Sequence, residues 1–402
     1  MNIVKIERPI SYDEYLNLEY KKLDELRLSY EQGFLKEDEL QARVAIVYDR
    51  IYDLIALKEN NRVVVPFYYL VLFDSDKKQL NYAVNNALDS LRIGEMSGHR
   101  LSSKELAVFL KYTNDIDFEE TDVNKISPED YATWAMPDKV QFTSRNTIVN
   151  GVATHNMRTV VYPTVVWDAW LATLMSYPSS KVVVKMKPMD SSKAISAIDR
   201  SLSELRVKVS SARTDSEALE AQKHLETLQL LLSSLQSENE VLLDVNIYVT
   251  AYDAVYTNDN PKLDDLQHET LRTKIVNMKK QIRRVWQEGG FRLNNMEFNQ
   301  ALAYIGSQIS GYDPMENDGR GIPSNTVAAM YPWVFPFVMD KGGVKIGTSE
   351  GAPVFIDFFK RDEERVNSNM VIVGKTGSGK SYAAKALLTN LAAEDAKIFV
   401  LD

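Results

Sequence analysis

The chain has 402 residues, 45% of them hydrophobic and 26% charged, which is typical of a globular protein with two or three domains. It contains no cysteine, which excludes disulfide bridges and thiolate metal sites, and its four histidines lack the spacing of metal ligands. The net charge of −9 argues against a nucleic-acid footprint over the whole chain, although it permits a local basic patch. No apolar run reaches about 18 residues, so we expect a soluble or peripheral protein.

Two helices are predicted at the start of the chain. Ser11-Tyr12-Asp13-Glu14 has the form of a capping box, and the charged stretch after it predicts a helix to about Gln32. After Gly33, apolar residues recur at spacings of three and four, which predicts a second helix that ends near residue 60. We expect these helices to form an N-terminal helical appendage over residues 1–61, more typical of a packing or oligomer surface than of a site.

Residues 62–325 are predicted to form an α+β docking domain. Its first strand, residues 62–74, contains Pro66, which indicates an edge strand or a bulge. Helices are predicted over residues 77–92 and after the capping box that begins at Ser102. Residues 114–138 are acidic and lack periodicity, which predicts a surface loop with short helical turns.

A hairpin and a further helix follow. Asn150-Gly151 between two apolar runs predicts a two-residue β-turn. Residues 163–175 predict a helix whose Trp167 and Trp170 belong in the core.

The middle of the chain predicts a strand, a long helical hairpin and a second strand. Residues 181–186 form the first strand, and two helices with apolar positions at three-four spacing meet near the capping box that begins at Thr214. Residues 243–250 alternate as expected for a half-buried strand. We expect the long helices to cover one face of a sheet.

The most basic predicted helix spans residues 266–286. Two interpretations of this charge are open. The charged residues form a solvated face with a few salt bridges, or they dock to an acidic partner, to nucleic acid or to anionic lipid. No aromatic residues interleave the charges, which makes single-stranded nucleic acid the least supported partner. Residues 311–324 are rich in Gly, Pro, Asp and Asn and predict a linker. The cations of the helix are Arg272, Lys274, Lys279, Lys280, Arg283 and Arg284.

Residues 374–381 fit the phosphate-binding pattern G-x-x-x-x-G-K-[ST]. An apolar run at 370–373 predicts a parallel strand before the loop, and helix-forming residues follow it. Lys380, the candidate catalytic residue, is expected to reach the β- and γ-phosphates of ATP or GTP, and the Ser381 hydroxyl to complete a Mg²⁺ shell. The alternative is a glycine-rich turn with an accidental Lys-Ser pair. The predicted cofactor-binding residues are Gly374, Lys375, Thr376, Gly377, Ser378, Gly379, Lys380, Ser381 and Tyr382.

Residues 397–402 predict the next strand of a βαβ unit, with Asp402 at its carboxyl edge. An acid at the end of a strand is often only a turn residue, and Asp402 does not occupy the Walker B position. We expect Walker B, the catalytic acid and an arginine finger to lie beyond residue 402. Residues 326–402 are therefore predicted to be the truncated start of a P-loop, RecA-like α/β motor domain, and the chain alone to hydrolyse nucleotide poorly.

The phosphate loop and the residues before it resemble a known family. Thr376-Gly377-Ser378-Gly379-Lys380-Ser381, preceded by residues 367–370 and 351–359, looks like the conjugation ATPases of type IV secretion systems, the VirB/TrbE/CagE class. The resemblance covers most of residues 62–402. It is strong around the loop and rests on the order of elements before it.

The resemblance implies a cytoplasmic ATPase, peripheral to the cell membrane through its partners, that uses ATP and Mg²⁺. It implies a homo-oligomer that works with the secretion channel, with inner-membrane components and with a coupling ATPase to assemble the channel or transfer DNA and protein. Direct nucleic-acid binding stays open. Two alternatives remain: a DNA-translocating ATPase of the HerA and FtsK kind, and a non-catalytic scaffold of the channel.

Overall fold

The computed structural model describes residues 1–60, 64–94, 96, 98–114, 120–163, 165–212, 214–237, 240–252, 265–334, 338–349, 352–361, 365–393 and 396–399. The chain divides into two compact units. The first consists of Met1–Glu7 and Pro66–Val334, and the second of Arg8–Val65 and Phe335–Asp402. The N-terminal helices and the phosphate loop thus belong to the same unit. The predicted domain limits after residues 61 and 325 remain predictions.

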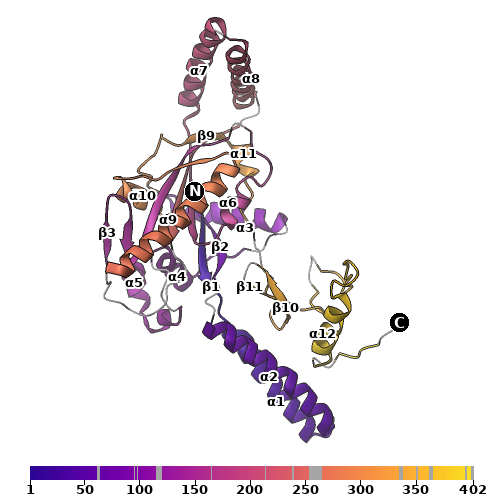
Figure 1. Ribbon diagram of the computed structural model, residues 1–402. Coiled ribbons are helices and arrows are strands. Elements are labelled where there is room, and N and C mark those ends of the chain that lie inside the picture. The colour runs from indigo at the N-terminus through magenta and orange to yellow at the C-terminus, as the bar shows by residue number, and fades with distance from the viewer. Residues whose placement is uncertain are drawn as a thin grey trace. The chain divides into compact units, whose positions relative to one another are not determined.

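The first unit is built on a nine-stranded sheet with the order β2-β1-β6-β7-β5-β4-β3, to which β8 adds beside β5 and β9 beside β7 (Figure 1). Its central pair is antiparallel, with Val183 opposite Tyr248. A mixed α and β fold with an antiparallel sheet is thus confirmed. The strands are β1 (Asn2–Pro9), β2 (Val64–Val71), β3 (Val140–Phe142), β4 (Thr147–Val149), β5 (Val152–Val161), β6 (Ser180–Pro188), β7 (Leu242–Tyr252), β8 (Arg292–Asn294) and β9 (Arg320–Pro323).

Strand β7 is buried along nearly its whole length, so the prediction of a half-buried strand is wrong. Its two faces belong to two hydrophobic clusters. Val249 packs in a cluster with Ile282 and Trp286 of α9 (Asp265–Glu288). Tyr248 packs in another with Phe109 of α4 (Ser103–Asn114). Because both faces are covered, the polar positions of the alternation are buried as well.

Local signals in the first unit are largely confirmed. Ser102 and Glu105 form the predicted capping box, in which the Ser102 N–H donates to Glu105 Oε2 at 2.8 Å. Asn150 and Gly151 adopt φ values of 50° and 88°, as a two-residue hairpin turn requires. The acidic region contains only short helical turns, and residues 115–119 lie outside the described part. The shorter helices of this unit are α3 (Lys77–Ile93), η1 (Glu120–Lys125), η2 (Pro128–Asp130), α5 (Tyr131–Ala135), α6 (Ala172–Ser176), α10 (Gln300–Gly306) and α11 (Ser324–Ala328).

The predictions for residues 163–175 and 311–324 are also wrong. The helix expected over residues 163–175 is reduced to α6, and Trp167 is 83% exposed rather than in the core. Backbone hydrogen bonds from Ala169 to Ala329 and from Leu171 to Met330 replace the expected helical bonds. Residues 311–324 are not a linker, because they include β9 and residues that hydrogen-bond to the sheet.

The helices α7 (Ser191–Ser211) and α8 (Asp215–Ser237) form the predicted antiparallel hairpin. Figure 1 shows this hairpin pointing away from the sheet, so the expectation that it covers a sheet face is wrong. The two helices pack mainly on each other through a small cluster that contains Ile198, Leu202 and Leu225. Their apolar stripes are buried against each other. A periodic apolar pattern is the same whether a helix packs on another helix or on a sheet, so the pattern alone did not distinguish these two arrangements.

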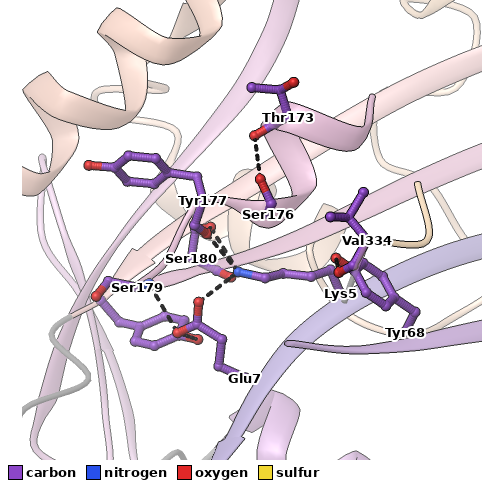
Figure 2. A network of polar contacts seen from close by, with 10 residues as sticks. Lys5, Glu7, Tyr68, Thr173, Ser176, Tyr177, Ser179, Ser180 and Val334 are labelled. Atoms are coloured by element: carbon purple, nitrogen blue, oxygen red, sulfur yellow. Dashed lines mark hydrogen bonds and ion pairs between the residues drawn. The ribbon is translucent and has the colours of Figure 1, made fainter. Parts of the chain in front are cut away.

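A buried ion pair fixes β1 beside the turn between α6 and β6 (Figure 2). Lys5 Nζ lies 2.7 Å from Glu7 Oε1 and also donates to the carbonyl oxygens of Tyr177 and Ser180 at 2.8 and 2.7 Å. Glu7 Oε2 accepts hydrogen bonds from the Ser179 N–H and from the Tyr252 hydroxyl, each at 3.0 Å. Both charges are therefore well satisfied inside the protein.

The second unit contains α1 (Asp13–Glu31), α2 (Glu37–Asn60), β10 (Val344–Ser349), β11 (Ala352–Ile356) and α12 (Lys380–Ala393). Its core joins apolar residues of α1 and α2 to Phe355 of β11. The predicted helices α1 and α2 are confirmed. The capping box expected at Ser11 is wrong, because Tyr12 occupies the cap position and makes no side-chain cap bond. No helix in the described part of the chain has the length and apolar character to cross a membrane.

Candidate nucleotide-binding site

The residues of the predicted phosphate loop come together immediately before α12. Gly377 and Gly379 adopt φ values of 79° and 84°, in the left-handed region that favours glycine. At Gly374 the loop folds closely on itself, since a Cβ atom there would lie 2.6 Å from Ser378 Oγ. These three glycines allow a tight turn that a chain of larger residues would not form.

The Lys380 side chain folds back over this loop. Its Nζ donates to the carbonyl oxygens of Gly374 and Lys375, both at 2.8 Å. The ammonium group is thus held on the loop at the first residue of α12. Ser381 follows in the first helical turn and is exposed, as is Tyr382.

The arrangement suits an anion with several oxygens. The N-terminus of α12, which has 14 residues, leaves backbone N–H groups without helical partners and carries the positive end of the helix dipole. Lys380 adds a full positive charge at the same place. The donor set therefore fits a nucleoside triphosphate, with Lys380 on phosphate oxygens and the Ser381 hydroxyl as a Mg²⁺ ligand. Mg²⁺ would supply neutralisation of the phosphate charge.

The two strands predicted around the loop are not formed in the described residues. Residues 370–373 are not paired with any described strand, and Val371 and Val373 are strongly exposed. Residues 397–399 are likewise not a strand, and Asp402 lies outside the described residues. A strand of a parallel sheet obtains its hydrogen bonds from neighbouring strands. The apolar pattern alone therefore did not suffice to form one here.

An ion-pair cluster around Asp340, which the sequence did not indicate, lies upstream of the loop. Asp340 is buried, and Arg365 donates to its two carboxylate oxygens at 2.6 and 2.7 Å. Lys360 Nζ and the Asp357 N–H also donate to it. The hydrogen bonds from Arg365 are the main reason that the pKa of Asp340 is held well below its usual range. This cluster ties the segment before the phosphate loop to the end of β11.

The other end of α12 packs against α2. Arg50 donates to the Asn390 side chain and to its carbonyl oxygen. The helix after the phosphate loop is therefore anchored to the N-terminal helices, which sequence periodicity did not reveal. Among the described residues, no group of three or more His, Asp or Glu side chains could hold a metal ion.

Two comparisons with known proteins bear on the chain. Residues 344–402 match the family model described as the central domain of helicase HerA. This segment is therefore similar to P-loop ATPases of the HerA type. That family is related to the ATPases of type IV secretion, so the coarser part of the predicted resemblance is confirmed. The HerA-type segment supports ATP binding and ATPase activity as the general class of chemistry.

The chain also resembles a protein of Bacillus anthracis, the uncharacterized protein pXO2-09. The two are 26% identical over 228 residues, which is 56% of this chain and 33% of the relative. The aligned part of the chain thus spans about a third of the length of this relative. The relative's name states no function.

Proposed function

We propose that the chain is the docking part and the start of the motor of an ATP-dependent subunit of a type IV secretion or conjugation system. The observation that carries the proposal is the phosphate loop, where Lys380 is held by two loop carbonyl oxygens at the start of α12. The HerA-type match over residues 344–402 supports the motor class. We further propose a homo-oligomer on the cytoplasmic side of the membrane, attached through channel and inner-membrane components.

In this proposal, Lys380 exchanges its contacts with the loop carbonyls for contacts with the β- and γ-phosphates. Because each loop contact is 2.8 Å long, the side chain already lies at the loop where the phosphates would bind. The glycines at 374, 377 and 379 keep side chains out of this region, and Ser381 provides a hydroxyl for Mg²⁺. ATP binding in the subunit would then drive channel assembly or transfer of DNA and protein.

Nucleotide titration tests the phosphate-binding step. We expect Mg²⁺-ATP to bind the chain, measured by calorimetry, and Lys380→Ala to weaken this binding at least tenfold, since it removes a charged contact. Lys385→Ala is the matched control, because Lys385 is an exposed lysine of the same helix. Absence of binding at millimolar nucleotide would contradict the proposal and favour a non-catalytic scaffold.

A DNA-translocating ATPase of the HerA and FtsK kind is the second candidate, and the family match favours it directly. Two experiments separate these candidates. A secretion motor with Lys380→Ala should lose conjugative plasmid transfer in cells, whereas ATP hydrolysis by a DNA translocase should be stimulated several-fold by duplex DNA. Strong stimulation by duplex DNA without any effect of Lys380→Ala on plasmid transfer would overturn the secretion role.

A further inference from the structure

A compact group of cations and exposed aromatic rings lies in the first unit, far along the chain from the phosphate loop. We call it the Arg145 patch, and it consists of Phe142, Arg145, Lys279, Arg283 and Phe298. It joins the turn between β3 and β4, the second half of α9 and the loop between β8 and α10. The basic helix predicted from the sequence thus supplies only part of it. The side chains of Arg272 and Lys274 lie outside the described residues.

Hydrogen bonds hold the turns of the patch in place. Thr143 Oγ1 accepts from the Asn146 N–H at 2.8 Å, which closes a tight turn around Arg145. The Phe298 N–H donates to the Ser144 carbonyl oxygen at 2.7 Å, which joins the two loops directly. The position of Arg145 and the position of Phe298 are therefore fixed relative to each other.

The positive charges of the patch lie close enough to affect one another. The pKa of Lys279 is lowered mainly by burial, and the charges of Arg283 and Arg145 lower it further against the opposing effect of Glu297. Burial and the charge of Lys279 also lower the pKa of His155, to about 4, so His155 is neutral at neutral pH. Within the described part of the chain, Arg145, Lys279 and Arg283 form no ion pair, although the chain is acidic overall.

Two aromatic rings on the joined loops are exposed. Phe298 is 84% exposed and has φ of 64°, a left-handed conformation that is rare for a bulky residue. Phe142 is 48% exposed, and its other edge contacts the Tyr304 ring at 5.7 Å between centroids. Left-handed backbone at a bulky residue costs about 1–3 kcal/mol, and such strained residues cluster at binding sites.

We propose that the Arg145 patch binds single-stranded nucleic acid. The three cations would contact phosphates, and Phe298 and Phe142 would stack on unpaired bases, the combination that single strands require. Duplexes hide their base faces, and anionic lipid headgroups offer no rings for stacking. The sequence made single strands the least supported partner because the rings come from segments distant from α9. The proposal does not depend on nucleotide binding at Lys380.

Fluorescence anisotropy with a labelled oligothymidylate of about 20 nucleotides tests the proposal on the whole chain, without ATP, from roughly 50 to 200 mM salt. We expect Arg145→Ala, Lys279→Ala and Arg283→Ala each to reduce the slope of log affinity against log salt by about 0.7. Phe298→Ala should weaken binding about 5- to 100-fold with little change in this slope. Phe298→Trp, which keeps an aromatic ring, should bind as tightly as the unchanged protein.

Arg284→Ala is the matched control, because Arg284 lies on the same helix but is ion-paired with Glu288 at 2.9 Å. It should leave affinity and slope unchanged, as should Lys380→Ala. The proposal is overturned if the oligonucleotide does not bind, or if a duplex binds as tightly as the single strand. It is also overturned if a variant that combines Arg145→Ala, Lys279→Ala and Arg283→Ala binds the oligonucleotide with unchanged affinity. Binding only to vesicles of phosphatidylglycerol would assign the patch to a membrane surface instead.

Discussion

Arg50 of α2 caps the C-terminal end of α12 through Asn390. Its Nε donates to Asn390 Oδ1 at 3.0 Å and its Nη2 to the Asn390 carbonyl oxygen at 2.7 Å. This carbonyl is one of the last four of the helix, which lack helical partners, and a guanidinium there also complements the helix dipole. Arg50 further lies 3.6 Å from Glu19, a nearly buried acid of α1. One side chain therefore joins three helices of the second unit.

We expect Arg50→Ala to destabilise the second unit by about 1–3 kcal/mol, because it removes these contacts and leaves Glu19 with one partner fewer. Hydrogen exchange of the α12 amides measures this loss. All five tryptophans belong to the first unit, so tryptophan fluorescence should show no comparable change. The control Lys21→Ala removes an exposed pair with Glu25 on α1 and should cost about 0.3–0.5 kcal/mol. Equal effects of the two variants would contradict this prediction.

Lys5 and Glu7 should contribute jointly, and not independently, to the stability of the first unit. The two side chains are 0% and 4% exposed, so removal of one leaves a buried charge without its counter-charge. We expect Lys5→Met and Glu7→Gln each to cost about 3–5 kcal/mol, and the double variant to cost clearly less than the sum. Urea unfolding followed by tryptophan fluorescence gives these values. Lys187→Met, at the exposed pair with Glu316, should cost no more than about 1 kcal/mol.

Features fixed by neighbouring residues were predictable from the sequence. The helices α2, α7, α8 and α9 follow from apolar spacing, and α1 follows from the charged stretch that precedes Gly33. The turn at Asn150-Gly151 and the loop before α12 follow from short motifs. Strand β1 was missed because Asn2 pairs with Lys185, far away in the chain, and an alternating run of eight residues says nothing of its partner. The cluster at Asp340 was missed for the same reason.

Contacts between distant segments also account for the wrong predictions. The residues near Asp313 have the composition of a linker, but the Asp313 carboxylate accepts hydrogen bonds from Asn246 and Tyr248 of β7. Trp167 is large and apolar, yet the backbone around it bonds to another segment instead of forming a helix. The Arg145 patch similarly combines rings and charges that no window of sequence contains together.

Asp340 should stabilise the second unit only while it is ionised. Its folded-state pKa is depressed, so its contribution is complete above the unfolded value of about 4 and declines as pH falls through the folded value. Asp340→Asn should therefore destabilise at pH 7 and have a smaller effect below about pH 4. Hydrogen exchange of the β11 amides, compared between Asp340→Asn and the unchanged protein at pH 7 and below about pH 4, measures this destabilisation. Asp24→Asn, at an exposed position of α1, is the control. A constant effect of Asp340→Asn across this range would show that the loss is one of packing and not of charge.

Lys181 should make the first unit more stable as pH rises above neutrality. Its Nζ is buried and donates to the Thr113 carbonyl oxygen at 2.9 Å, and burial, followed by the charge of Lys185, lowers its pKa to about 7. The unfolded lysine has a pKa of about 10.4, so between these values the unfolded chain binds more protons and stability increases with pH. Lys185 has a pKa lowered to about 8 by burial, against the opposing charge of Asp313, and acts in the same direction.

The variant Lys181→Met separates the two lysines. Urea unfolding monitored by tryptophan fluorescence measures the midpoint at each pH. In Lys181→Met the rise in midpoint between pH 7 and about pH 9 should be smaller, because only the contribution of Lys185 remains. Tyr252 and Tyr304, which line the cavity beside Lys181, have pKa values raised by burial and do not titrate in this range. Lys223→Met, at an exposed position of α8, should retain the full rise. A profile of Lys181→Met parallel to that of the unchanged protein would mean that Lys181 stays charged, with its ammonium group satisfied inside the cavity.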